Sequence, residues 1–452
     1  MHQLDYTYSF DYISDQLKNG QIRITDHATN QTHELQVAVN DDQLSLINYR
    51  TISPLLADLI DIATAIHVAD RFSKSDSRMP RRMLLRLPIR QLEIIDRPSI
   101  HKKLQDVLYW FTEDHWFFDF ITYNKLGRPA EIETPLPIDS EICHSKCVAL
   151  WSGGLDSFAG VYQRLLLDET TCYTLFGTGS NGIISRAQKR TAAAIESFFP
   201  KRTKLIQLPF RLKDVHSSVR KSSSARSRGF VFMLLGAVCA YQEGQNVLHI
   251  YENGIGAINL PFRKSEVGLD HSRSVHPLSL CYMGELLSEI LGQPFFFKNP
   301  FLFWTKAQMC REPIQGGVAE AIFSTISCDS RHRKQPIQCG YCSSCLLRRQ
   351  AIASNGIEDR TRYQITEKTG RQRRQDDDTH YCAMLAQVDT MRELLSASDS
   401  WQKMAHYYSS LVDIVEIVDE PQIVTQDNIL NLYQKYVYEW DGVKHIIGSE
   451  FL

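Results

Sequence analysis

A glycine-rich hexapeptide in the first half of the chain combines residue types that suit phosphate binding. It follows an apolar segment, precedes a helical pattern, and reads Ser152-Gly153-Gly154-Leu155-Asp156-Ser157. Glycines let a phosphate approach backbone N–H groups, and the amino terminus of the following helix favours an anion. The serine hydroxyls can donate further hydrogen bonds, and the carboxylate of Asp156 can hold Mg²⁺ beside a triphosphate. A glycine turn with ordinary helix caps is the alternative, but the whole string between a strand and a helix favours phosphate binding.

A second group of residues has the composition of a metal site. Three cysteines lie within seven residues, at Cys339, Cys342 and Cys345, and Cys328 precedes them by ten intervening residues. Four thiolates satisfy the tetrahedral coordination of Zn²⁺, and a closed Cys₄ shell leaves no position for water. We therefore expect a structural zinc ion that fixes a loop near the hexapeptide, although an iron–sulfur cluster uses the same ligands. The remaining cysteines are scattered, and we expect core residues or surface thiols.

The pattern from Lys146 onward predicts the scaffold that must hold these residues. Short apolar strands alternate with helical stretches. We expect strands at 147–151, 171–176, 203–208 and 246–251, and helices at 155–167, 186–199 and 230–243. Repeated βαβ units form a doubly wound parallel sheet, and ligands bind beyond the carboxyl ends of its strands. The fold class is therefore α/β, and the site should be lined by loops 152–157, 177–186, 209–228 and 252–276.

One of these loops carries polar side chains that could recognise a base. Glu252, Asn253 and Gly254 follow the strand expected at 246–251. A carboxylate accepts hydrogen bonds from ring N–H and amino groups, while an amide both donates and accepts. We therefore predict that this loop contacts a purine-like substrate.

The length of the chain, 452 residues, indicates more than one domain. Residues 1–145 mix strand-like pieces with a helical stretch and predict an N-terminal α+β domain, which a proline-containing linker at 133–140 would join to the next. Residues 146–355 contain the hexapeptide and the four cysteines. Residues 356–452 predict a mostly helical C-terminal extension, interrupted by a solvated charged loop at 371–378.

Composition narrows the choice of partners and location. The formal net charge of −2 gives no overall nucleic-acid signal, so no nucleic-acid partner is expected. The cations of loop 209–228 nevertheless leave a tRNA-modifying enzyme as an alternative. The longest nearly apolar run, 230–241, is too short to span a bilayer, and the amino terminus lacks the features of a signal peptide. A cytoplasmic protein without a membrane partner is predicted.

Taken together, the motifs resemble a known group of enzymes. The hexapeptide is similar to the PP-loop of N-type ATP pyrophosphatases, which split ATP between its α- and β-phosphates and adenylate a carboxyl or carbonyl oxygen. With Ser327-Cys328 and Cys339-Gly340-x-Cys342-x-x-Cys345-x-x-Arg348, the chain resembles the 7-cyano-7-deazaguanine synthase family over about residues 147–350. The resemblance implies that Arg228, at the start of the third helix, and Lys306, in a proline-to-threonine-lysine segment, neutralise phosphate charge. It also implies ATP, Mg²⁺ and Zn²⁺ as cofactors.

The resemblance also implies a substrate. Two departures from the family's sequence pattern, however, leave the final product open. Enzymes of that family adenylate 7-carboxy-7-deazaguanine, let ammonia displace AMP, and dehydrate the amide to a nitrile with more ATP. Here Gly229 replaces the asparagine that usually follows the arginine, and loop 252–258 lacks the family's valine-asparagine and aspartate-tyrosine pattern. The chain is also about twice the usual length.

The length makes the chain look more like the enlarged synthase-like proteins of bacterial antiviral systems. That resemblance implies an amide bond between the deazaguanine carboxyl and an amine of a partner protein, which would dock on residues 1–145 and the helical tail. The alternatives are a nitrile synthase of queuosine or deazapurine biosynthesis, the tRNA-modifying enzyme, and a non-catalytic nucleotide-binding scaffold. The presence of Asp156 argues against the scaffold.

Overall fold

The computed structural model describes residues 4–12, 21–27, 29–38, 41–45, 47, 50–74, 79–124, 128–132, 145–179, 181–209, 211–214, 226–262, 273–329, 338–367, 378–418 and 423–449. The expected linker at 133–140 lies outside these ranges. So do positions 371–377 of the charged loop, residues 215–225 of loop 209–228, and residues 263–272 of loop 252–276.

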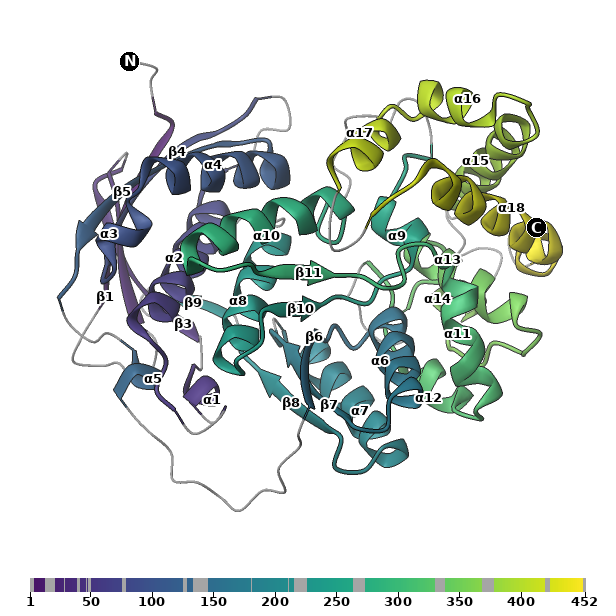
Figure 1. Ribbon diagram of the computed structural model, residues 1–452, viewed down its shortest axis with the longest axis horizontal. Coiled ribbons are helices and arrows are strands. Elements are labelled where there is room, and N and C mark those ends of the chain that lie inside the picture. Colours follow the sequence, from purple (N-terminus) through teal and green to yellow (C-terminus); the bar gives the residue numbers. More distant parts are fainter. Residues whose placement is uncertain are drawn as a thin grey trace.

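Five parallel strands form the central sheet (Figure 1). Their order is β11-β10-β6-β7-β8, with β6 at Ser145–Leu150, β7 at Thr171–Gly177, β8 at Thr203–Gln207, β10 at Val247–His249 and β11 at Phe296–Lys298. The first strand in sequence, β6, lies in the middle, and the chain adds strands first on one side and then on the other. This is a doubly wound parallel sheet, so the predicted α/β fold class is confirmed.

Helices cover both faces of this sheet because successive side chains of each strand point to opposite faces. In β6, Val148 belongs to the core beneath α8 (Arg228–Gln242) and α10 (Pro277–Leu291), whereas Ala149 belongs to the core beneath α6 (Leu155–Leu167). Helix α7 (Gly182–Phe198) lies on the α6 side. It begins earlier than the pattern indicates, because the side chain of Asn181 accepts hydrogen bonds from two N–H groups of its first turn.

A second, mixed sheet lies at the amino-terminal side of the molecule. Its order is β5-β4-β1-β2-β3-β9, with β1 at Tyr6–Tyr12, β2 at Gln21–Asp26, β3 at Gln31–Ala38, β4 at Arg82–Ile89, β5 at His115–Thr122 and β9 at Arg211–Asp214. Strand β9 follows β8 in sequence and pairs antiparallel with β3. The edge of this sheet is therefore completed by a segment of the central region.

The helices that cover the amino-terminal sheet pack against the helices that cover one face of the central sheet. Helix α2 (Pro54–Phe72) packs against α8, and α4 (Pro98–Thr112) packs against α10 (Figure 1). One hydrophobic core runs through these layers and includes Tyr8 of β1, Leu59 of α2 and Phe230 of α8. The division into three domains stays a prediction, and both this core and β9 extend across the boundary expected at residue 145.

The C-terminal region is helical, as predicted. Its main helices are α15 (Thr379–Leu395), α16 (Ser400–Tyr407), α17 (Ser410–Ile417) and α18 (Gln426–Gly448). Helix α18 packs on α15 and on α13 (Ser343–Ser354), and buries Tyr436 and Trp440. The remaining helices are short: α1 (Asp42–Ser45), α3 (Leu92–Ile95), α5 (Pro129–Ile132), α9 (Gly254–Ile258), α11 (Lys306–Gln315), α12 (Ala319–Ser324) and α14 (Gln364–Glu367).

Two expectations from composition can be compared with the fold. Cys172 is disulfide-bonded, so the expectation that the scattered cysteines are core residues or surface thiols is wrong for this residue. The apolar run at 230–241 forms most of the buried helix α8. Among the described residues, no helix combines the length and the apolar character that crossing a bilayer requires.

Candidate active site

A cavity of about 660 Å³ opens at the carboxyl ends of the central strands. Its wall contains residues that follow β6, β7 and β10, together with the first residues of α8 and α11. The polar lining residues that the sequence singled out are Ser152, Ser157, Arg228, Glu252, Asn253 and Lys306. The crevice at this edge is where a doubly wound sheet binds its ligand.

The hexapeptide forms the turn between β6 and α6. Gly153 has a φ of 72°, and a β-carbon at this position would lie 2.9 Å from the backbone nitrogen of Gln188. The N–H of Gly154 donates to Ser152 Oγ at 3.1 Å, and the hydroxyls of Ser152 and Ser157 lie 3.1 Å apart. Ser152 and Ser157 line the cavity, and the two glycines and the start of α6 lie between them in the chain. Hydroxyls beside a glycine turn and a helix start suit an anion.

Gly153→Ala tests the conformation of this loop. We expect a loss of about 3 kcal/mol in the free energy of unfolding, because alanine at positive φ costs about 1–2 kcal/mol and the contact with Gln188 adds about 1–3 kcal/mol. Gly244→Ala is the matched control, since Gly244 has a φ of 77° but no heavy atom within 4 Å of the added carbon. Denaturant unfolding measures both. Equal losses in the two variants would show that the contact is unimportant.

Asp156 lies in a cluster of buried polar side chains at the start of α6, with 8% of its surface exposed. One carboxylate oxygen accepts a hydrogen bond from Asn253 Nδ2 at 3.0 Å, and the other accepts from the Lys306 ammonium. Burial alone would lower the pKa of Lys306, but the negative charges of Asp156 and Glu252 outweigh it and raise the pKa. These charges therefore favour the charged form of Lys306 at the cavity. These contacts describe a carboxylate that holds Lys306, and the role of Asp156 as a Mg²⁺ ligand stays a prediction.

The loop after β10 is built around Asn253, which is fully buried. Its amide nitrogen donates to Asp156 and to Glu252 Oε1, and its amide oxygen accepts from the N–H of Gly256 at 3.0 Å and so caps α9. Gly254 packs against Leu302, whose carbonyl oxygen would lie 2.0 Å from an added β-carbon. This close packing explains why residue 254 is a glycine. The contacts give Asn253 the role of joining this loop to Asp156. Recognition of a base by the loop stays a prediction.

Arg228 is the first residue of α8 and is half-buried in the cavity wall. Its guanidinium carbon lies 4.9 Å from the centroid of the Phe232 ring, one turn further along the helix. A β-carbon on Gly229 would lie 2.6 Å from Ser274 Oγ. The close approach of Ser274 therefore explains why glycine follows the arginine.

The four cysteines lie together, as the sequence predicted, and all are buried. Their sulfur atoms lie within 4.8 Å of one another, and the Cys339–Cys345 and Cys342–Cys328 pairs are each 3.9 Å apart. A tetrahedron with Zn–S bonds of about 2.3 Å separates its sulfurs by about 3.8 Å. The N–H of Cys342 also donates to Cys339 Sγ at 3.2 Å, which supports a thiolate there. The residues therefore fit a tetrahedral metal ion such as Zn²⁺.

The cysteine cluster is joined to the hexapeptide by the segment before Cys328. The N–H of Ile326 donates to the carbonyl of Gly153 at 3.1 Å. Arg348, fully buried on α13, donates to Thr325 Oγ1 at 2.6 Å and to the carbonyl of Ile322 at 2.7 Å. A metal ion that fixes Cys328 would therefore also fix the backbone beside the hexapeptide.

Comparisons with known proteins agree with this geometry in part of the chain. Residues 214–356 match the family model described as "Queuosine biosynthesis protein QueC". A protein of Acinetobacter baylyi (strain ATCC 33305 / BD413 / ADP1) named "7-cyano-7-deazaguanine synthase" is 39% identical over 75 residues, which are 16% of this chain and 30% of that protein. Both comparisons support a QueC-like family. The chain thus covers less than a third of the length of the curated relative it matches.

The QueC-like segment covers the second half of the site. It includes Arg228, loop 252–258, Lys306 and the four cysteines, but it begins at residue 214, after the hexapeptide. The predicted role of residues 152–157 in phosphate binding is therefore supported by the geometry of the turn and not by the family match.

Three cavity residues carry no signal in the sequence pattern. Gln188 of α7 is 2% exposed; its amide nitrogen donates to the carbonyl of Trp151 at 2.8 Å, and its amide oxygen accepts from the N–H of Gly179 at 3.2 Å. It therefore ties together the chain after β6 and the chain after β7. Gln387 of α15 and Tyr433 of α18 bring the C-terminal helices into the wall. The sequence does not reveal that these residues line the cavity, because a glutamine or tyrosine occurs on many ordinary helix faces.

Proposed function

We propose that this protein uses ATP to adenylate the carboxylate of a 7-deazaguanine, with 7-carboxy-7-deazaguanine as substrate, and transfers the acyl group to an amine. The observation that carries the proposal is the meeting of the phosphate loop, Arg228, Lys306 and the 252–256 loop in one cavity. The QueC-like match to residues 214–356 and the name of the Acinetobacter relative support the deazaguanine substrate.

The chemistry consists of two displacements. An oxygen of the carboxylate attacks the α-phosphorus of ATP, and the bond to the bridging oxygen of pyrophosphate breaks. The amine nitrogen then attacks the acyl carbon, loses a proton, and releases AMP as an amide forms. Adenylation turns a poor electrophile into an acyl phosphate with a good leaving group.

The side chains of the cavity suit the first displacement. The glycine backbone and the hydroxyls of Ser152 and Ser157 would bind phosphate oxygens, and Arg228 and Lys306 would neutralise the charge that develops on pyrophosphate. Mg²⁺ carried by ATP would supply further neutralisation, with Asp156 as its candidate ligand. The Cys₄ site would hold Zn²⁺ as a structural ion, since four thiolates leave no position for a reacting group.

We further propose an amine of a partner protein as the acceptor and an amide as the product. The support is the extent of the chain beyond the QueC-like segment: 452 residues, against about 250 for the relative, as 75 residues are 30% of that protein. A function in antiviral defence, as implied by the sequence resemblance, belongs to the same proposal. The name of the relative favours a second candidate product, 7-cyano-7-deazaguanine, which would require dehydration of the amide with more ATP.

Product analysis separates the two candidates. The protein is incubated with 7-carboxy-7-deazaguanine, MgATP and either ammonium or a peptide with an exposed amine, and the products are measured by mass spectrometry. We expect one AMP and one pyrophosphate per amide formed, and little nitrile. A reaction without the carboxylate should release pyrophosphate only at background rate. Efficient nitrile formation from ammonium would overturn the amide proposal, and absence of carboxylate-dependent pyrophosphate release would overturn adenylation itself.

A further inference from the structure

Both candidate cations of the cavity are the first residue of a helix. Arg228 begins α8, and Lys306 begins α11. The helix macrodipole places about half a positive charge at this end, so a cation there is disfavoured. Each helix start must therefore be held by other groups, and in both helices a carboxylate from outside the central sheet contacts the residue just before the cation. Asp70 is buried and Glu439 is half-buried.

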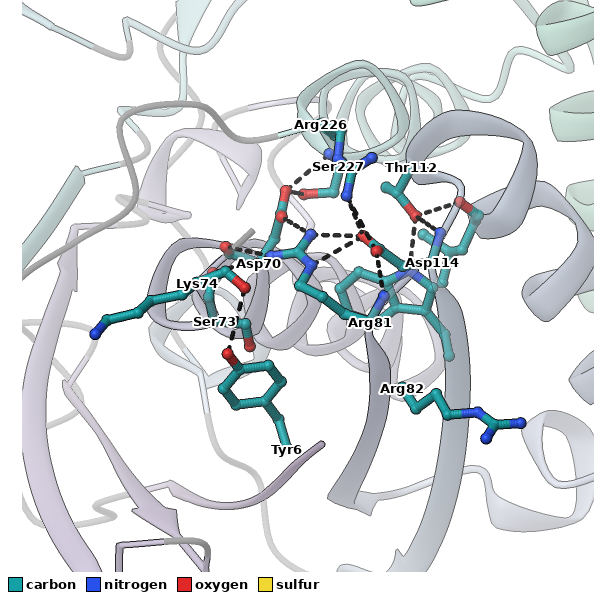
Figure 2. A network of polar contacts seen from close by, with 12 residues as sticks. Tyr6, Asp70, Ser73, Lys74, Arg81, Arg82, Thr112, Asp114, Arg226 and Ser227 are labelled. Carbon is teal, nitrogen blue, oxygen red and sulfur yellow. Dashed lines mark hydrogen bonds and ion pairs between the residues drawn. The ribbon is translucent and has the colours of Figure 1, made fainter. Parts of the chain in front are cut away.

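On the amino-terminal side, this carboxylate is Asp70 of α2. It accepts hydrogen bonds from the backbone N–H of Ser227 at 2.9 Å and from the hydroxyl of Ser227 at 2.7 Å. Its other oxygen pairs with Arg81 at 2.6 Å. Asp114, which follows α4, pairs with Arg81 and with Arg226 and so extends the network (Figure 2). Asp70, Asp114 and Ser227 are each at most 1% exposed, so these bonds have no competition from solvent.

On the carboxyl-terminal side, the carboxylate is Glu439 of α18. It accepts from the hydroxyl of Thr305 at 2.5 Å and from the amide of Gln350 at 3.0 Å. Thr305 is the N-cap of α11: its hydroxyl also accepts from the N–H of Gln308, whose side chain accepts from the N–H of Thr305. Glu439 therefore fixes the rotamer of the cap, and through it the start of the helix at Lys306.

We propose that the two regions flanking the central sheet act as positioning elements for the phosphate-binding cations. Asp70 acts through Ser227 on Arg228, and Glu439 acts through Thr305 on Lys306. The proposal rests on the proposed function in assigning these two cations to the phosphates of ATP. It gives residues 1–145 and the helical tail the same role, because each contributes one carboxylate that directs one cation toward the cavity.

Substitutions of the two carboxylates test this with MgATP as the probe. We expect Asp70→Asn and Glu439→Ala each to raise the Kd for MgATP by about tenfold, measured by calorimetry on protein that is folded at the measuring temperature. In Asp70→Asn, the new amide nitrogen must face a donor of either Arg81 or Ser227, because each carboxylate oxygen of Asp70 accepts from one of them. Ser227→Ala removes only the hydroxyl donor and keeps the Asp70–Arg81 pair, so it tests the same link even if Asp70→Asn fails to fold. It should raise the Kd by about threefold.

Matched controls separate positioning from stability. Asp58 lies on the same helix as Asp70, is also buried and pairs with Arg90, and Asp441 follows Glu439 on α18 and pairs with Arg392. Asp58→Asn and Asp441→Asn should leave the Kd for MgATP unchanged. Glu439→Gln keeps an acceptor for Thr305, so its Kd should stay within about twofold of the native value. Unchanged affinity in Ser227→Ala and Glu439→Ala, or an equal loss in the controls, would overturn the proposal.

Nucleotide binding does not depend on which carboxylate the enzyme accepts. Native protein that binds MgATP but does not turn over 7-carboxy-7-deazaguanine would therefore contradict the proposed substrate alone. The Kd values of the variants would still decide whether the flanking carboxylates position the cations.

Discussion

Asp156→Ala is expected to reduce pyrophosphate release by at least ~1,000-fold, the largest effect that we expect from a single substitution in the candidate site. The carboxylate holds the Lys306 ammonium and accepts from Asn253, so its loss removes the group that fixes the cation and links the 252–256 loop to the hexapeptide. In the proposed reaction it also removes the candidate ligand of Mg²⁺. The measurement is the rate of carboxylate-dependent pyrophosphate release.

A stability effect must be separated from this loss of rate. Removing one member of a buried ion pair costs about 3–5 kcal/mol, because the remaining charge is uncompensated. The double variant Asp156→Asn/Lys306→Met removes both charges and should recover most of that stability, as measured by thermal unfolding, while it stays inactive. Asp156→Ala protein that keeps more than about a tenth of the native rate would contradict a role for this carboxylate in ATP cleavage.

Cys345→Ser is expected to remove the metal and to unfold the segment around it. Native protein should carry about one zinc per chain, and the variant close to none, as measured by elemental analysis after dialysis. Because metal binding to such sites contributes directly to folding free energy, we expect the free energy of unfolding to fall by at least about 3 kcal/mol. Affinity for MgATP should fall as well, since the backbone next to Cys328 donates to the carbonyl of Gly153.

Cys239→Ser provides the comparison for this variant. Cys239 is fully buried in α8 and lies in the core shared with α2, apart from the cysteine cluster. The Cys239→Ser variant should keep the native zinc content. Its free energy of unfolding should fall by about 1 kcal/mol, because a hydroxyl is buried in place of the thiol. Full zinc content in Cys345→Ser would show that the cluster is not a Cys₄ site, and iron with an absorbance band in the visible range would favour an iron–sulfur cluster over zinc.

The central sheet could be predicted because its signals are local. Each βα unit places an apolar run beside a helical pattern, and α6 has the bounds that the sequence indicates, Leu155–Leu167. The turn formed by the hexapeptide and the grouping of the four cysteines could be predicted for the same reason, since the residues of each group are close in sequence or share a rare type. The cysteine cluster in particular needs no knowledge of the rest of the fold.

Contacts between distant segments could not be predicted in this way. Nothing near Asp156 in the sequence indicates that Lys306, 150 positions later, pairs with it. Asn253 has the residue type expected of a base-reading side chain, yet its amide groups are bonded to Asp156, Glu252 and Gly256. The residues Asp70 and Glu439 look like ordinary helical carboxylates, because their importance depends on which helix start each one reaches.

Strand β9 has a consequence for how this architecture can be divided or recombined. The strand is encoded between β8 and α8, yet it covers the edge of β3 in the amino-terminal sheet. A chimera that exchanges only residues 1–145 with those of a relative would break this pairing and leave β3 as an exposed edge, which favours association between molecules. The unit that can be inherited or transplanted intact is therefore discontinuous in sequence and includes residues 211–214.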